Sequence, residues 1–202
     1  MATRDRILDG AADVMRSRGL ARTTTKEIAR AAGYSEATLY KIFDDKVDLF
    51  LAVVAERLPR MSIVRDGVGA YVGRDTVVSN LVTIVTEAAL FYSESFPIAA
   101  SLFSDTELLT RHRDGVRSRG AGPESLAAAV ADYMSAEQRE GRVATAARPD
   151  AMAAALIGAC LHRGFLRCFD GKGDTADEAR QFADELVETL SPALLTDSTP
   201  RH

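Results

Sequence analysis

The chain has 202 residues, of which 47% are hydrophobic, and this is enough to bury a core in one domain or two small ones. Its formal net charge of -4 argues against a general polyanion binder, because sequence-independent affinity for DNA comes from Lys and Arg that neutralise phosphates. The sequence contains no run of eighteen apolar residues and its amino end is charged, so we expect a cytoplasmic protein without a membrane span or signal peptide.

The hydrophobic residues recur with the helical period, and no alternation is long enough for a sheet, so the predicted fold is all-α. The first helix is expected from about Arg4 to Ser17, and Gly19 then stops it. Thr24 starts a second helix, because its hydroxyl can cap the helix while Glu27 reaches back in a capping box. Gly33 can adopt the left-handed conformation that ends this second helix.

Two further helix starts follow closely. Ser35 is predicted to cap a third helix that runs to about Ile42, and Asp45 to cap a fourth that begins at Lys46. The connection between the second and third helices is very short, so the two must cross steeply. We expect this crossing to bury four apolar side chains: Ile28, Ala32, Leu39 and Phe43.

The third helix is expected to project from this crossing and to suit the major groove of a nucleic acid. Its outward residues are short or hydrogen-bonding, and could lie against base edges and phosphates. They are Glu36, Ala37, Thr38, Tyr40 and Lys41. Helix amino ends present unpaired amide groups, so the starts at Thr24, Ser35 and Asp45 could each approach a phosphate, with Lys46 adding charge.

These signals occur in a specific order over residues 4–50. The order is Thr23-Thr24-Thr25-Lys26-Glu27-Ile28-Ala29, Ala32-Gly33-Tyr34-Ser35, Thr38-Leu39-Tyr40, and Phe43 followed by Lys46. It resembles the tetracycline-repressor (TetR) family, and is more specific than a bare helix-turn-helix pattern. The resemblance implies a DNA-binding transcriptional regulator whose motif spans about residues 27–46. It also implies that Tyr40 and Lys46 contact phosphates, that Thr24 and Ser35 anchor helix starts, and that residues 36–38 read bases. Thr25, Lys26, Ala37 and Lys41 complete the predicted DNA-binding set.

The chain departs from the family pattern at the start of the third helix. Glu36-Ala37 stands where family members often have Lys-Gly, so we expect a different operator. Two interpretations of Glu36 stay open: its carboxylate could accept a hydrogen bond from a cytosine amine, or it could simply face solvent. Lys41 and Ile42 also replace residues that are commonly His-His or His-Tyr in the family.

The remaining residues, 51–202, are predicted to form a second helical domain after a DNA-binding domain of residues 1–50. Three glycines interrupt the chain between residues 61 and 73, and a long helix is expected from Thr76 to Ser95, with Pro97 able to start the next one. Further helices are expected at about Glu124 to Glu140, Pro149 to Phe169 and Thr175 to Leu190, the last with a second capping box.

Side chains of this second domain allow both functional and packing interpretations. Six residues could line an inducer pocket, although aromatic residues on helices more often belong to the core: Phe91, Tyr92, Phe96, Phe103, Tyr133 and Met134. The segment Arg111-His112-Arg113 is interpreted as a solvated loop or helix end in preference to an anion site. Cys160 and Cys168 suit neither a zinc site nor a disulfide framework, so no metal and no cofactor is predicted.

The last two long helices are predicted to form the interface of a homodimer, through Met152, Leu156, Ala159, Phe182, Leu186 and Leu190. A twofold dimer would address a near-palindromic operator in double-stranded DNA. The family resemblance implies a repressor that an unknown small-molecule inducer releases. Two other classes remain open, a helical enzyme with a vestigial helix-turn-helix and an interaction module that has lost DNA binding. The sequence contains no phosphate loop, nucleophile elbow or metal signature that would favour an enzyme.

Overall fold

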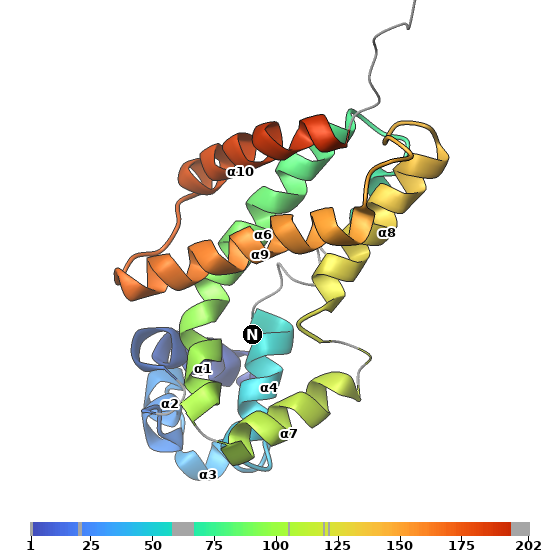
Figure 1. Ribbon diagram of the computed structural model, residues 1–202. Coiled ribbons are helices and arrows are strands. Elements are labelled where there is room, and N and C mark those ends of the chain that lie inside the picture. Colours follow the sequence, from blue (N-terminus) through green and yellow to red (C-terminus); the bar gives the residue numbers. More distant parts are fainter. Residues whose placement is uncertain are drawn as a thin grey trace, which may run out of the picture. The chain divides into compact units, whose positions relative to one another are not determined.

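The computed structural model describes residues 2–19, 22–57, 67–104, 106–118, 120 and 122–194 (Figure 1). Every regular element in these ranges is a helix, which confirms the all-α prediction. The chain divides into two compact units, Met1–Pro59 with Glu94–Gly122, and Arg60–Ser93 with Pro123–His202. The predicted DNA-binding segment therefore lies in the first unit, together with a later part of the chain.

The first four helices begin within one residue of their predicted starts, and α1 and α2 also end within one residue of their predicted ends. They are α1 (Thr3–Arg18), α2 (Thr25–Ala32), α3 (Glu36–Leu39) and α4 (Lys46–Arg57). Gly19 donates its N–H to the carbonyl of Met15 and ends α1, while Gly33 ends α2 at φ 77°. The helix α3 is shorter than the sequence predicted, because regular helix stops at Leu39 and the chain continues to Phe43 in turns.

A glycine allows α1 and α2 to approach closely. A Cβ atom added at Gly10 would lie 2.9 Å from the backbone nitrogen of Ala32, a distance that side chains essentially never show. The apolar side chains on both sides of the helix crossing are buried, as expected: Ile28, Ala32, Leu39 and Phe43. The orientation of the α2–α3 pair is therefore set by a packed core beneath it.

Ion pairs connect the far end of α4 to α1. The guanidinium of Arg57 donates to the carboxylates of Asp5 at 2.9 Å and Asp9 at 2.6 Å. Arg4 donates both of its terminal nitrogens to Glu56, at 2.6 and 2.7 Å, in a bidentate pair. The carboxyl end of α4 is thus held against α1.

A further helix, α7 (Thr106–Arg117), packs on α4 after the short 3₁₀ turn η2 (Ser101–Ser104). The sequence interpretation of Arg111-His112-Arg113 as a loop or helix end is wrong, because these residues lie inside α7. The ring of His112 lies edge-on to Phe50, with centroids 5.5 Å apart, and burial lowers its pKa. Arg111 pairs with Asp45, the residue that caps α4.

The second unit contains η1 (Val68–Tyr71), α8 (Ser125–Arg139), α9 (Pro149–Phe169), α10 (Ala176–Leu190) and η3 (Ser191–Ala193). The helix α6 (Val77–Ala100) begins in this unit and ends in the first one. Pro97 lies inside α6, so the expectation that it starts a new helix is wrong. Proline is preferred at the first helical position, but it can also continue a helix at the expense of one backbone hydrogen bond.

A buried polar cluster fixes η1 and its following turn against α8. Glu137 is fully buried and accepts hydrogen bonds from Arg142, at 2.5 and 2.6 Å, and from the N–H of Gly73. Asn80 donates to the hydroxyl of Tyr133 at 3.0 Å, and burial raises the pKa of Tyr133 to about 12. These polar groups are partnered inside the core, so Tyr133 has a structural role there.

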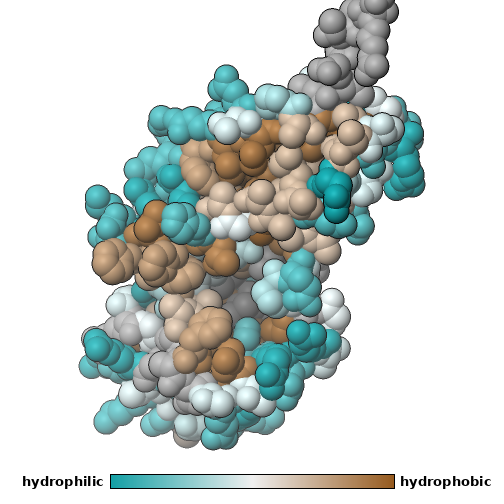
Figure 2. Space-filling model, viewed as in Figure 1, coloured by the Kyte–Doolittle hydropathy of each residue, from teal (hydrophilic) through white to brown (hydrophobic). Residues whose placement is uncertain are grey.

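The helix α9 has two apolar faces of different kinds. One face is buried in the core of the second unit and includes Ala153, Leu156, Ile157, Cys160 and Gly164. The other exposes large apolar side chains, Leu161, Phe165, Leu166 and Phe169, and Figure 2 shows hydrophobic surface along α9 and toward α10. Of the described helices, α9 is the one long and apolar enough to cross a membrane, with a mean hydropathy of 1.3.

Candidate nucleic-acid interface

Two capped helix starts position the candidate interface. The hydroxyl of Thr24 accepts the N–H of Glu27, whose carboxylate in turn accepts the N–H of Thr24 at 3.1 Å, so the predicted capping box is present. The hydroxyl of Ser35 accepts the N–H of Thr38 and also lies 2.9 Å from the hydroxyl of Thr38. These bonds fix where α2 and α3 begin, and therefore where the residues after them point.

The first residues of α2 and α3 are joined by a hydrogen bond between side chains. Thr25 opens α2 and Glu36 opens α3, and the Thr25 hydroxyl donates to Glu36 Oε1. The hydroxyl of Tyr40, just after α3, lies 3.2 Å from the same Thr25 oxygen. The Glu36 carboxylate is therefore half-buried and bonded to α2, whereas the sequence left open a base contact or a solvent-facing position.

The remaining predicted DNA-binding residues lie at the surface of the first unit. Lys26, Ala37 and Lys41 are exposed, Tyr40 is 51% exposed, and Thr38 and Lys46 are half-buried. The start of α2, the whole of α3 and the start of α4 follow one another closely in the chain, and the apolar residues of this segment are buried beneath them. Such a surface offers both small groups for base edges and donors for phosphates.

The charge of this segment is only weakly positive. Between residues 22 and 46 there are five basic residues (Arg22, Lys26, Arg30, Lys41 and Lys46) and four acidic ones (Glu27, Glu36, Asp44 and Asp45). Five minus four leaves a net charge of +1. Asp45 caps α4 through the N–H groups of Val47 and Asp48. Burial opposes its ionisation, but these bonds and Arg111 outweigh that effect and lower its pKa. Phosphate attraction alone therefore supplies little affinity here.

The amino-terminal segment of the first unit matches known proteins in sequence. Residues 7–53 match the family of bacterial regulatory proteins named tetR. The match covers the amino-terminal segment, which is thus similar to the DNA-binding segment of TetR-family regulators. A segment of 54 residues is also 43% identical to the uncharacterised helix-turn-helix regulator YvkB of Bacillus subtilis. That alignment covers 27% of this chain and 29% of YvkB, so less than a third of this relative is matched.

Solved structures resemble the chain over nearly its whole length. A protein assigned to the TetR family from Mesorhizobium loti is similar with a TM-score of 0.75 at 20% identity, covering 96% of this chain and 97% of that one. FadR of Bacillus subtilis, solved with stearoyl-CoA, has a TM-score of 0.68 at 13% identity, with 92% and 96% covered. SmeT, the repressor of the efflux pump SmeDEF of Stenotrophomonas maltophilia, has a TM-score of 0.65 at 22% identity, with 98% and 93% covered. The whole chain thus has the fold of TetR-family regulators.

The six residues predicted to line an inducer pocket lie in different surroundings. Phe91, Tyr133 and Met134 are buried, and the last two belong to the core of the second unit. Tyr92 is half-buried, and burial raises its pKa to about 12. Phe96 and Phe103 belong to the first unit, and Phe103 is 75% exposed. Aromatic type alone did not distinguish core positions from surface positions.

The six residues predicted at a dimer interface also differ in exposure. Met152, Ala159, Phe182, Leu186 and Leu190 are half-buried, whereas Leu156 is 1% exposed and faces the core of its own unit. The exposed apolar residues of α9 were not predicted as part of the interface, because the prediction for this helix used Met152, Leu156 and Ala159. Leu161, Phe165, Leu166 and Phe169 share the helical spacing that could have revealed them.

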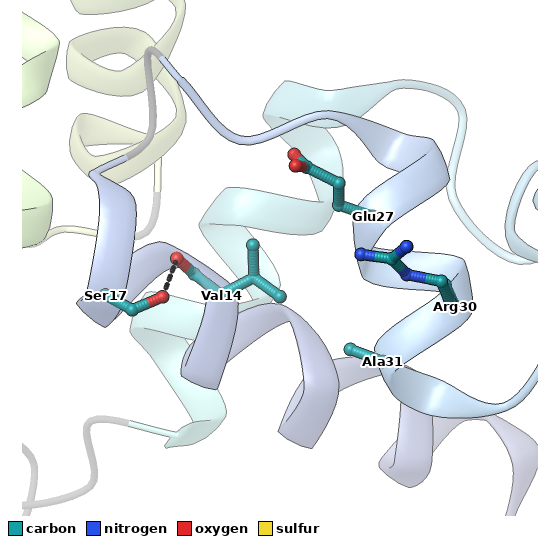
Figure 3. A pocket seen from close by; sticks show the side chains of 5 residues that line it. All are labelled: Val14, Ser17, Glu27, Arg30 and Ala31. Carbon is teal, nitrogen blue, oxygen red and sulfur yellow. Dashed lines mark hydrogen bonds between the residues drawn. The ribbon is translucent and has the colours of Figure 1, made fainter.

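A surface depression between α1 and α2 is lined by Val14, Ser17, Glu27, Arg30 and Ala31 (Figure 3). The hydroxyl of Ser17 donates to the carbonyl of Val14 at 2.9 Å, so its proton is used within α1. None of the six predicted pocket residues lines this depression. Across the described ranges, no three His, Cys, Asp or Glu side chains are grouped to hold a metal ion.

Proposed function

We propose that this protein is a TetR-family regulator that binds duplex DNA in a sequence-specific way and represses transcription until a small molecule releases it. One observation carries the proposal: two capped helices joined by a short turn present Ala37, Thr38 and Lys41 at the surface over a buried core. This is the arrangement by which a helix-turn-helix enters the major groove. The match of residues 7–53 to the TetR family favours a regulator over the alternative of a helical enzyme.

The experiment that tests DNA binding is selection from a library of random duplexes. The purified chain is mixed with the library, bound duplexes are recovered over several rounds, and their sequences are compared. We expect one sequence pattern to be enriched, since base contacts discriminate by roughly 1–3 kcal/mol for each good pair. Recovery of duplexes without a common pattern would favour the interaction-module alternative.

The protein is further proposed to act as a homodimer that uses α9 and α10. The exposed residues of α9 recur at spacings of three and four positions and form one apolar stripe: Leu161, Phe165, Leu166 and Phe169. Leu186 and Leu190 on α10 are only partly covered by their own unit. An apolar surface of this kind marks a protein or membrane contact.

Charged groups on the same two helices favour a second copy over a membrane. Arg163 donates to Asp174 at 2.6 and 2.9 Å, and Arg167 donates to Glu178 at 2.6 Å. These cations lie in the carboxyl-terminal third of α9, where a lipid environment would penalise them. Two copies related by a twofold axis would cover the stripe and place two helix-turn-helix segments on a near-palindromic operator.

Ligand control is proposed to act through α4. This helix begins beside the candidate interface and carries buried Leu49, Phe50 and Val53 through the first unit. Its start is joined to α7 by the Asp45–Arg111 pair and by Phe50 against His112. An inducer must bind the DNA-incompetent arrangement more tightly, since equal affinity for both arrangements would shift nothing.

The test of ligand control is a screen for release of the protein from its selected duplex. FadR was solved with stearoyl-CoA and SmeT represses a multidrug efflux pump, so acyl compounds and apolar aromatic compounds are the first classes to include. We expect at least one class to lower operator affinity. A compound that binds tightly and leaves operator affinity unchanged would count against the coupling.

A further inference from the structure

Glu36 lies on the candidate DNA-binding surface, yet it carries a negative charge and accepts a hydrogen bond from Thr25, whose hydroxyl oxygen lies 3.2 Å from that of Tyr40. We propose that the Glu36 carboxylate is an intramolecular competitor of DNA phosphate. It holds the hydroxyl protons of Thr25 and Tyr40 within the protein, and thereby weakens binding to duplex DNA of every sequence. The inference rests on the proposed DNA-binding function.

The direction of the hydrogen bonds follows from the count of protons. Thr25 has one hydroxyl proton, and it is donated to Glu36 Oε1. The ionised carboxylate of Glu36 is an acceptor only. The contact of 3.2 Å between the Thr25 and Tyr40 oxygens therefore has Tyr40 as its donor. Both protons point inward along one chain of bonds, from Tyr40 to Thr25 to Glu36.

A carboxylate and a phosphate would accept hydrogen bonds from the same hydroxyl groups at this site. Both are anionic oxygen acceptors, and hydrogen bonds to either are roughly twice as strong as neutral ones. Thr25 is the first residue of the eight-residue helix α2, whose positive end favours a negative charge beside it. Tyr40 is 51% exposed, so its hydroxyl lies where a phosphate could reach it. An approaching phosphate therefore meets hydroxyls whose protons are already used, next to a like charge.

The small positive charge of the segment makes this competition matter. With Glu36 present, residues 22–46 carry a net charge of +1, and without its carboxylate they would carry +2. Phosphate contacts position a protein on DNA but carry no base information. Removing the competitor should thus strengthen binding to operator and to unrelated DNA by the same factor.

The experiment compares the affinities of the full-length chain and its variants for two fluorescent duplexes, the selected one and a shuffled one. Glu36→Ala removes the acceptor and the charge, whereas Glu36→Gln keeps the shape and a neutral acceptor. We expect Glu36→Ala to tighten binding to both duplexes by roughly tenfold, the worth of one charge-assisted hydrogen bond, and Glu36→Gln to do so by less. Asp13→Asn removes one charge from the exposed face of α1 and should change either affinity by less than about twofold.

A second variant tests the chain of bonds itself. In the wild-type background the Tyr40 proton is used internally, so Tyr40→Phe should cost little affinity. In the Glu36→Ala background the same change should cost roughly fivefold, since the freed hydroxyl then donates to phosphate. Equal effects of Tyr40→Phe in the two backgrounds would contradict the proposal, and circular dichroism would confirm that every variant is folded.

The outcomes separate the inference from the proposed function. If wild-type protein binds the selected duplex and Glu36→Ala binds no more tightly, the inference is overturned and the proposed function stands. If Glu36→Ala changes affinity for the selected duplex alone, Glu36 reads a base, which also overturns it. If neither wild type nor Glu36→Ala binds any duplex, both the inference and the proposed function fail.

Discussion

Lys46 and Thr38 occupy the same candidate interface but should contribute differently to binding. Lys46 begins α4 and offers charge to a phosphate, so Lys46→Ala should weaken binding to all duplexes and lower the salt dependence of affinity. Thr38 lies on α3, with its hydroxyl held by Ser35, so Thr38→Ala should change which duplex is preferred. Binding isotherms on a panel of selected duplexes distinguish the two effects. An unchanged order of preference with Thr38→Ala would mean that this side chain is not read.

The buried carboxylate of Glu137 should make stability depend on pH. Burial opposes its ionisation, but hydrogen bonds from Arg142 and the N–H of Gly73 outweigh burial and lower the pKa of Glu137. Because the pKa is lower in the folded state, this contribution is present above the ordinary pKa of a glutamate and is lost as pH falls through the folded value. Glu137→Gln should therefore cost about 2 kcal/mol of unfolding free energy near neutral pH, and less in acid.

Urea denaturation at neutral and acidic pH measures this difference. Glu140→Gln, at an exposed position just after α8, is the matched control and should leave the stability and its pH dependence nearly unchanged. A loss with Glu137→Gln that is the same at both pH values would show that packing, and not the charge, is responsible.

At the scale of helices, the approach of α1 to α2 depends on Gly10. A Cβ there would lie 2.9 Å from the backbone nitrogen of Ala32, and backbone cannot move aside as a flexible side chain can. Gly10→Ala should destabilise the first unit by about 1–3 kcal/mol, the usual cost of overpacking, despite the better helix propensity of Ala. Ser17→Ala, exposed on the same helix, is the control, and thermal unfolding is the measurement. A Gly10→Ala protein as stable as wild type would show that the two helices can separate freely.

Helix boundaries were predictable where a residue acts on its own neighbours. The capping boxes at Thr24 and Thr175 and the bounds Pro149–Phe169 of α9 agree with the structure, because caps and glycine ends are local interactions. Pro97 was misplaced because the same residue can begin a helix or continue one, and the choice depends on tertiary packing. The helix α7 was missed for a related reason, since its polar sequence has no fully buried residue.

The candidate site was predictable in its residues but not in its bonds. The order of caps, glycine and aromatic residues located the helix-turn-helix, because each of these residues is required by local backbone geometry. The bond between Thr25 and Glu36 joins two helix starts across the turn, and no spacing in the sequence specifies it. The predicted pocket residues were unreliable because aromatic side chains serve equally well in the core, as Tyr133 does.

At the scale of the whole molecule, the apolar stripe of α9 and α10 predicts a dimer. Leu186→Glu with Leu190→Glu, or Phe165→Glu alone, should yield folded monomers, since each places a charge where the proposed partner would bury it. Analytical ultracentrifugation gives the oligomeric state, and a mobility-shift assay gives the affinity for the operator. This affinity should fall in a monomer, because only one helix-turn-helix segment then contacts the DNA. Asp184→Ala, exposed on α10 in a pair with Arg180, is the control. A folded variant that remains dimeric would place the interface elsewhere.

The proposed dimer, ligand response and role of Glu36 all depend on sequence-selective binding to duplex DNA. The direct measurement is the dissociation constant for the selected duplex against that for the same duplex with shuffled bases, at physiological ionic strength. Residues 22–46 carry a net charge of only +1, so phosphate attraction alone should give weak binding. Base contacts from the two helix-turn-helix segments of a dimer should then supply most of the affinity. We expect a preference of roughly a thousandfold or more for the selected duplex. Equal affinity for the two duplexes, or no binding to either, would contradict the proposed function.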